Sequence, residues 1–168
     1  NTNNKTIFYT ALYHSMIAPN IFNDINGDYR GTDLKVHHSK GDVYTVFSLW
    51  DTFRATHPLY TIIEQEKTKA FNATFLKHFK DGGQLPIWEL SANYTGCMIG
   101  YHVVSVIYDA VNKGIEIEDE EELLKAMVHI SNRDKLGIPE YISYGYIPAE
   151  KETESVSKTL EYAYNDWC

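Results

Sequence analysis

Apolar residues recur at helical spacing through most of this 168-residue chain. They return about every three or four positions, which is the period of one face of an α-helix. The pattern predicts amphipathic helices over residues 6–18, 58–82, 95–113, 119–130 and 155–168. Pro19 and the glycines at 82, 83 and 114 supply the expected stops for three of these helices.

Three stretches break this period. Residues 20–40 predict a loop or short hairpin with a turn at Asn26-Gly27, and residues 131–151 predict a loop rich in tyrosine and glycine. Residues 43–49 alternate and predict a short strand, followed by a helix that begins at Asp51 or Thr52. The expected fold is mainly α and built from helical hairpins, with one or two short strands in loops.

Polar and aromatic side chains gather in residues 85–102, where one predicted helix has ended and the next begins. Trp88, Glu89 and His102 belong to this stretch. Residues 47–57 have the same character, with Asp51 and Arg54 one helical turn apart. The two stretches together form a candidate binding face, although an N-cap role for Asp51 is the simpler interpretation of its position.

Composition excludes several classes of function. The net charge of -8 and the absence of a Lys/Arg cluster argue against a nucleic-acid partner. No apolar run reaches the roughly 18 residues that a membrane span needs. Gly-rich phosphate loops, CxxC pairs and the HExxH spacing are absent. Cys97 and Cys168 could pair, but Cys97 at the start of an apolar helix is expected to be a small buried hydrophobe.

A metal site has only weak support in the sequence. Asp24, Asn26 and Asp28 alternate oxygen-bearing side chains, but the glycine stands at the fourth position and Lys35 at the twelfth. A turn with a solvated acidic face is therefore favoured over a calcium loop. Carboxylates and tryptophans are the groups that sugar hydrolysis requires, and the chain has both.

Five motifs, in order along nearly the whole chain, resemble glycoside hydrolase family 92, a family of exo-acting α-mannosidases. They are FYTALYHSMIAPN (8–20), NDINGDYRGTD (23–33), FSLWDTFRATHPL (47–59), GGQLPIWELSANYTGCMIGYH (82–102) and SVSKTLEYAYNDWC (155–168). The resemblance implies a calcium-dependent, inverting hydrolase whose (α/α)6 barrel follows a β-sandwich domain. Residues 1–168 would then be part of that single barrel domain, which is incomplete in this chain, with no second domain.

The resemblance also implies roles for individual residues. Asp51 and Arg54 would hydrogen-bond mannose hydroxyls, Trp88 would pack on the sugar ring, and Glu89 and His102 would orient the sugar or the groups around it. The general acid and base are expected outside this chain, and calcium ligands are not assigned.

Several expectations about context follow from the same resemblance. The implied partners are a mannose-containing glycan and the remaining parts of the same polypeptide, and the implied location is extracellular or periplasmic. The alternative is a non-catalytic helical domain that binds carbohydrate or serves as a scaffold.

Overall fold

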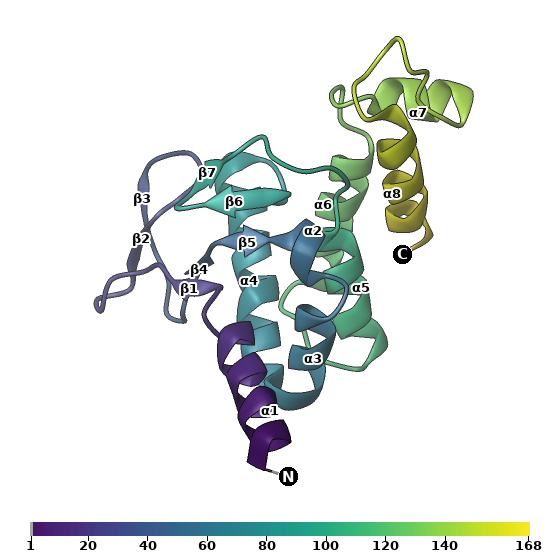
Figure 1. The fold of residues 1–168 in the computed structure, drawn as a ribbon. Helices are drawn as coiled ribbons and strands as arrows, with labels where there is room; N and C mark the ends of the chain where they lie inside the picture. The colour runs from purple at the N-terminus through teal and green to yellow at the C-terminus, as the bar shows by residue number, and fades with distance from the viewer. Residues whose placement is uncertain (1) are drawn as a thin grey trace.

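The computed structural model describes residues 2–168 and is mainly helical, as the sequence pattern predicts (Figure 1). The helices are α1 (Thr2–Ser15), α2 (Leu49–Thr52), α3 (Thr56–Ile63), α4 (Gln65–Gly82), α5 (Val103–Asn112), α6 (Glu120–Ser131), α7 (Ile138–Tyr144) and α8 (Ser155–Trp167). The strands are β1 (Asn20–Ile21), β2 (Asp28–Arg30), β3 (Val36–His38), β4 (Tyr44–Thr45), β5 (Phe47–Ser48), β6 (Trp88–Leu90) and β7 (Asn93–Tyr94).

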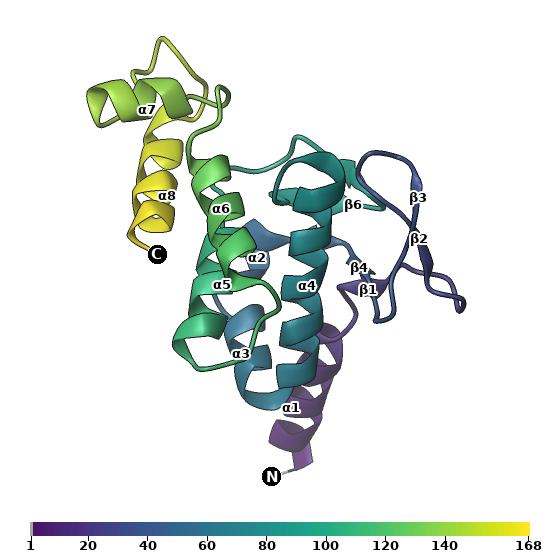
Figure 2. The same cartoon turned by 180° about the vertical axis from the view of Figure 1, so that it is seen from behind.

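Helix α4 is the centre of the fold and contacts α3, α5 and α6, as the two opposite views show (Figures 1 and 2). Its inward face carries Phe71 and Phe75, and both rings meet Phe47 of β5 edge to face, the second at 4.8 Å between ring centroids. All three rings are essentially buried. Aromatic pairs in this geometry add stabilisation beyond the area that they bury, so this cluster joins the helical layer to the strands.

The strands β1 to β7 form three small antiparallel sheets. The sequence predicted only one or two short strands. Strand β1 pairs with β4, β2 pairs with β3, and β6 lies between β5 and β7. In the three-stranded sheet, Phe47 lies opposite Glu89 and Ser48 lies opposite Trp88. The sheet therefore brings the two stretches that the sequence singled out into register.

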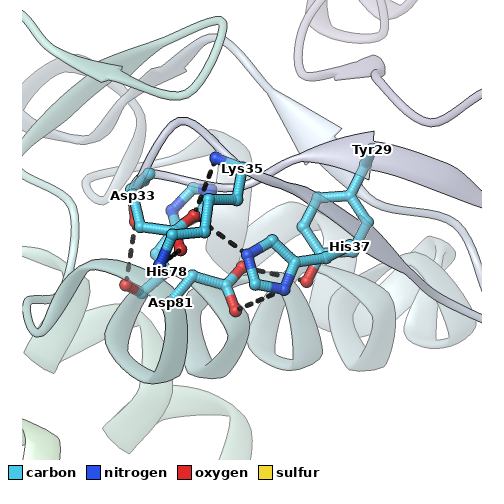
Figure 3. Close-up of polar contacts among 7 residues, drawn as sticks. Tyr29, Asp33, Lys35, His37, His78 and Asp81 are labelled. Atoms are coloured by element: carbon cyan, nitrogen blue, oxygen red, sulfur yellow. Dashed lines mark hydrogen bonds and ion pairs between the residues drawn. The ribbon is translucent and has the colours of Figure 1, made fainter.

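The β2–β3 hairpin is fastened to the C-terminal part of α4 by polar contacts (Figure 3). The Tyr29 hydroxyl donates to Asp81 at 2.9 Å. The two ring nitrogens of His37 face two carboxylates, Asp33 at 2.9 Å and Asp81 at 3.7 Å. The hydrogen bond from His37, together with that from the Lys35 backbone N–H, lowers the pKa of Asp33 to about 2. The contacts of Tyr29 and His37 with Asp81 hold the hairpin against α4.

A second link joins α4 to β4 through side chains that are fully buried. Asn72 is 0% exposed and donates to the Thr68 carbonyl oxygen at 2.8 Å. Two residues later, the hydroxyl of Thr74 accepts the backbone N–H of Tyr44 at 3.3 Å. The Thr74 hydroxyl therefore joins α4 to β4, while the Asn72 side-chain oxygen has no hydrogen-bond partner among the described residues.

The first helix forms, but its predicted apolar stripe is not buried. The helix ends at Ser15, before Pro19, and none of its described residues is buried. Ile7 and Phe8 are each 60% exposed. The link to the rest of the fold runs through the Tyr60 hydroxyl, which donates to the Ser15 carbonyl oxygen at 2.5 Å.

The predicted helix over residues 58–82 is two helices in the structure. Glu64, with φ -143° and ψ 56°, ends α3 and precedes α4. Ile62 and Ile63 were expected in the core and are 73% and 44% exposed, because the break turns their face outward. The expected stop is confirmed, since Gly83 adopts the left-handed conformation that a helix C-cap favours.

The helix expected to begin at Thr95 begins eight residues later, at Val103. Gly96, Met98 and Gly100 all have positive φ, which no helix accommodates. Cys97 is consequently exposed and not a buried hydrophobe. Once the helix starts, it is buried on several sides, as its apolar sequence predicts.

The last part of the chain also departs from expectation. The tyrosine-rich stretch predicted to be a loop contains α7. Gly137 and Gly145, both in left-handed conformations, stand at its two ends.

None of the helices formed by residues 2–168 is long and apolar enough to cross a membrane.

Two histidines, His57 and His78, lie in the core next to the aromatic cluster. They are 4% exposed, and His57 Nε2 and His78 Nδ1 have no hydrogen-bond partner among the described residues. Burial lowers the pKa of each to about 4 from the ordinary 6.5, because the core disfavours the charged imidazolium. Both side chains are therefore neutral in the folded protein at neutral pH.

We expect the free energy of unfolding to fall as the pH is lowered from about 6.5 to about 4. In this window the unfolded chain binds protons at both histidines and the folded chain does not. Over the whole window, each histidine therefore lowers the free energy of unfolding by on the order of 3 kcal/mol. Urea unfolding at a series of pH values measures the effect. His57→Leu should flatten the pH dependence, and exposed His14→Gln should leave it unchanged. An equal pH dependence in all three proteins would contradict the assignment.

Candidate functional site

The candidate site is built at the corner where β5 runs into α2. The helix begins at Leu49, earlier than the predicted start at Asp51 or Thr52. Asp51 lies in the first turn, where a carboxylate is stabilised by the helix dipole, and its Oδ2 accepts the Ser48 hydroxyl at 2.5 Å. The side chain of Asp51 is otherwise exposed. Its carboxylate therefore retains acceptor capacity for a ligand.

Arg54 lies one turn further on and is held by aromatic rings. Its guanidinium carbon stands 4.8 Å from the ring centroid of Trp50 and 4.6 Å from that of Phe53. Nη2 also contacts Glu161 Oε1 of α8 at 3.5 Å. The side chain is 50% exposed, so the rings hold the guanidinium in place while several N–H donors face solvent.

An open cleft of about 710 Å³ lies beside Arg54. One wall comes from the segment between α2 and α3, a second from α5 and a third from α8. The lining residues are Phe53, Arg54, Pro58, Ser105, Tyr108, Asp109, Leu160, Glu161, Tyr164 and Trp167. Aromatic faces beside a guanidinium and two carboxylates are the groups that hold a sugar, since the C–H face of a pyranose packs on rings and its hydroxyls need donors and acceptors.

His102 lies directly behind this cleft and is 1% exposed. Its ring stacks on Phe53 with 3.9 Å between centroids and 2° between planes. Its Nδ1 lies 3.0 Å from Asn165 Nδ2, and its Nε2 lies 2.8 Å from Glu161 Oε2 without the alignment of a full hydrogen bond. Burial, and secondarily the charge of Arg54, lowers the pKa of His102 to about 4, so the ring is neutral.

Glu89 points away from the cleft and into the sheet. It is 2% exposed, and its carboxylate accepts the Thr45 hydroxyl at 2.9 Å and the backbone N–H groups of Val46 and Ala92 at 3.2 and 2.6 Å. Burial raises the pKa of this carboxyl, and the three donors oppose that rise. In this arrangement Glu89 can support the site only indirectly, through the backbone that it holds.

Trp88 is half-buried on β6, in register with the Ser48 that bonds to Asp51. Strand pairing therefore places it next to the start of α2. Glu161 of α8 contacts both Arg54 and His102. Glu89 lies beside Trp88 on β6, with its side chain on the inner side of the sheet formed by β5, β6 and β7.

Sequence reasoning missed Glu161, which contacts both Arg54 and His102. Its position one turn before Asn165 on the final helix was the available signal. That spacing puts both side chains on one helix face.

Residues 2–168 contain no group of three or more His, Cys, Asp or Glu side chains that could hold a metal ion. In the loop that the sequence offered as a weak calcium candidate, Asp28 Oδ2 accepts the Asn26 amide at 2.8 Å and Oδ1 contacts His38 Nδ1 at 3.1 Å. The Asn26 side-chain oxygen in turn accepts the backbone N–H of Asp28 at 3.1 Å. This is an Asx-type turn in which the side-chain oxygens of Asn26 and Asp28 bind groups of the loop itself, and it lacks the ligand set that calcium needs.

Comparisons with known proteins identify the family of this chain. A family model described as the glycosyl hydrolase family 92 catalytic domain matches residues 1–168. The structure of the family GH92 α-mannosidase BT3965 from Bacteroides thetaiotaomicron is 45% identical, with a TM-score of 0.92 over 96% of this chain and 22% of that chain. The same enzyme is known in complex with mannoimidazole.

Two further relatives are more distant. The family GH92 inverting mannosidase BT2199 from the same organism is 37% identical, with a TM-score of 0.88 over 96% of this chain and 23% of that chain. An uncharacterised secreted glycosidase from Arthroderma benhamiae is 24% identical over 96% of this chain and 19% of its own length. The chain thus spans about a fifth of each relative. Its mainly helical fold is part of the family's helical barrel, and the chain belongs to the catalytic domain of glycosyl hydrolase family 92.

Proposed function

We propose that this chain is part of an exo-acting α-mannosidase that hydrolyses terminal α-linked mannose from glycans, of the α-1,2-mannosidase type. The observation that carries the proposal is the match of the whole chain to the family, together with the TM-score of 0.92 to an α-mannosidase. The cleft agrees with it, because its aromatic and charged lining suits a sugar.

In this proposal, residues 1–168 are part of a single barrel domain and supply one part of the sugar-binding site. Asp51 and Arg54 bind mannose hydroxyls, Trp88 packs on the ring, and Glu89 and His102 hold the surrounding groups. We add Glu161 to this set, because its carboxylate lines the cleft between Arg54 and His102.

The reaction is proposed to proceed with inversion. Inverting glycosidases place a general acid and a general base roughly 6.5–9.5 Å apart, so that a water molecule fits between the base and the sugar. We assign neither role in this chain, and we expect both in other parts of the polypeptide. This chain's own residues bind and orient the sugar.

Calcium dependence is also proposed, from family membership. Residues 2–168 contain no group of three or more His, Cys, Asp or Glu side chains that could hold the ion, and we assign no calcium ligands in this chain. The other proposed partners are the rest of the barrel, the β-sandwich domain and a mannose-containing glycan. An extracellular or periplasmic location is proposed as well, in line with the secreted relative.

We expect the full-length gene product to hydrolyse an aryl or disaccharide α-mannoside and to lose activity when a calcium chelator is added. Added calcium should restore the rate, and magnesium should not. Release of mannose, followed with time, is the measurement. A folded protein with no activity on any α-mannoside would refute the hydrolase proposal and favour a carbohydrate-binding domain.

Replacing Asp51 by alanine should lower kcat/KM for an α-mannoside by about tenfold or more, since a charged hydrogen bond to a hydroxyl is lost. The matched control is Asp134→Ala, which removes another exposed carboxylate. Steady-state kinetics of both variants provide the comparison. Equal kinetics in the two variants would remove Asp51 from the site.

Two glycines in the same loop provide a further matched pair. Both Gly96 and Gly100 have positive φ, but a Cβ at Gly100 would lie 2.5 Å from His102 Nε2, while nothing lies within 4 Å at Gly96. Gly96→Ala should therefore cost only backbone strain, about 1 kcal/mol. Gly100→Ala should lower Tm further and reduce kcat/KM on the order of tenfold, because it displaces His102. Indistinguishable variants would show that the position of His102 does not matter to the site.

A further inference from the structure

A chain of buried polar contacts runs from the backbone of Tyr101 to the wall of the cleft. Asn165 of α8 is 1% exposed, and its Oδ1 accepts the Tyr101 backbone N–H at 2.8 Å. Its Nδ2 lies 3.0 Å from His102 Nδ1. Beyond the ring, His102 Nε2 lies 2.8 Å from Glu161 Oε2. Four groups are thus connected in one line.

The first contact fixes the orientation of the Asn165 amide. A backbone N–H can only donate, so the amide atom next to Tyr101 must be the oxygen. The other amide atom is then the nitrogen, which carries two N–H donors and accepts nothing. His102 Nδ1 must therefore be the acceptor, and a neutral His102 carries its proton on Nε2.

The other end of the chain agrees with this tautomer. With the proton on Nε2, an N–H faces the Glu161 carboxylate, whereas the opposite tautomer would set a lone pair against an anion at 2.8 Å. The contact lies off the N–H axis, and the Glu161 side chain, which is 19% exposed on the cleft wall, can align by rotation. The ring itself is fixed by the stack on Phe53 and by the close approach of Gly100.

We propose that Asn165 is a positioning residue, which keeps His102 as the Nε2–H tautomer so that His102 donates to Glu161 and holds this carboxylate beside Arg54. The tautomer follows from the hydrogen bonds alone. The clause that Glu161 is thereby placed for a sugar rests on the proposed function.

The charged and titratable groups around the ring set its protonation. Glu161 and Tyr164 face it from α8, and Arg54 faces it from the segment after α2. Arg54 opposes a second proton on the ring, and so does burial. The neutral form should therefore persist through the pH range in which most histidines titrate, near 6.5.

Ring-nitrogen NMR of the full-length protein labelled with ¹⁵N-histidine tests the tautomer directly. The His102 signals are identified by their loss in His102→Gln. We expect a protonated Nε2 and an unprotonated, pyridine-type Nδ1 at neutral pH. A pyridine-type Nε2, or an imidazolium, would overturn the proposal. This measurement uses the unaltered protein and so does not depend on the folding of an Asn165 variant.

Asn165→Asp is the sharpest variant, because it exchanges one NH₂ for an oxygen of similar size. The new carboxylate still accepts the Tyr101 N–H, but it can only accept at Nδ1 as well. Because Arg54 and burial oppose a second proton on the ring, the ring proton should move from Nε2 to Nδ1, and Nε2 should then no longer donate to Glu161. Asn132→Asp, at an exposed amide, is the matched control. His102 signals that stay unchanged in folded Asn165→Asp would overturn the role of Asn165.

Binding of mannoimidazole to the same proteins, measured by calorimetry, separates this inference from the proposed function. We expect Asn165→Asp to bind about tenfold more weakly than the unaltered protein and Asn132→Asp to bind equally well. A changed tautomer with unchanged affinity would overturn the positioning of Glu161. If the unaltered protein does not bind mannoimidazole, the proposed function fails, and the NMR result alone decides the inference.

Discussion

The buried carboxylate of Glu89 is the interaction on which the sheet side of this fold depends. Three of its neighbours, Val46, Ser91 and Ala92, have positive φ, a conformation that costs non-glycine residues free energy. The carboxylate accepts backbone N–H groups from two of them, Val46 and Ala92, and also binds the Thr45 hydroxyl, whose oxygen accepts the N–H of Ser91. One buried carboxyl group therefore accepts hydrogen bonds from the backbone at two separate bends. These bends flank the pairing of β5 with β6, in which Ser48 lies opposite Trp88.

The cleft depends on a second, more distant link, because one of its walls comes from the final helix. Helix α8 reaches the body of the fold through the segment before α5. Asn165 binds the Tyr101 backbone, Tyr162 stacks on the Tyr101 ring, and the Tyr101 hydroxyl donates to Asp166. The loop that the sequence offered as a binding stretch therefore also anchors the helix that carries Glu161. Binding surface and support come from the same residues, which explains why polar and aromatic side chains are concentrated there.

Helical periodicity predicted most of the helices, because burial against α4 rewards an apolar stripe whatever the details of packing. It failed where local backbone conformation decides: Glu64 divides one stripe into α3 and α4, and Met98 with positive φ delays α5. Strand pairing sets Trp88 opposite Ser48, whose hydroxyl donates to Asp51. The inward turn of Glu89 and the part played by Glu161 could not be read from the sequence, since both depend on contacts between segments more than forty residues apart.

The burial of Asn72 has a consequence for how the protein can be produced. Asn72-Ala73-Thr74 has the form of an N-glycosylation acceptor, as do the sites at Asn4 and Asn93. Asn4 and Asn93 are exposed, so a glycan on either would lie in solvent. Asn72 is 0% exposed and Thr74 is bonded to β4, so a glycan added there during translation would block the packing of α4. Expression in a secreting eukaryotic host would therefore give two products. Chains without a glycan at Asn72 could fold, and chains glycosylated at Asn72 could not.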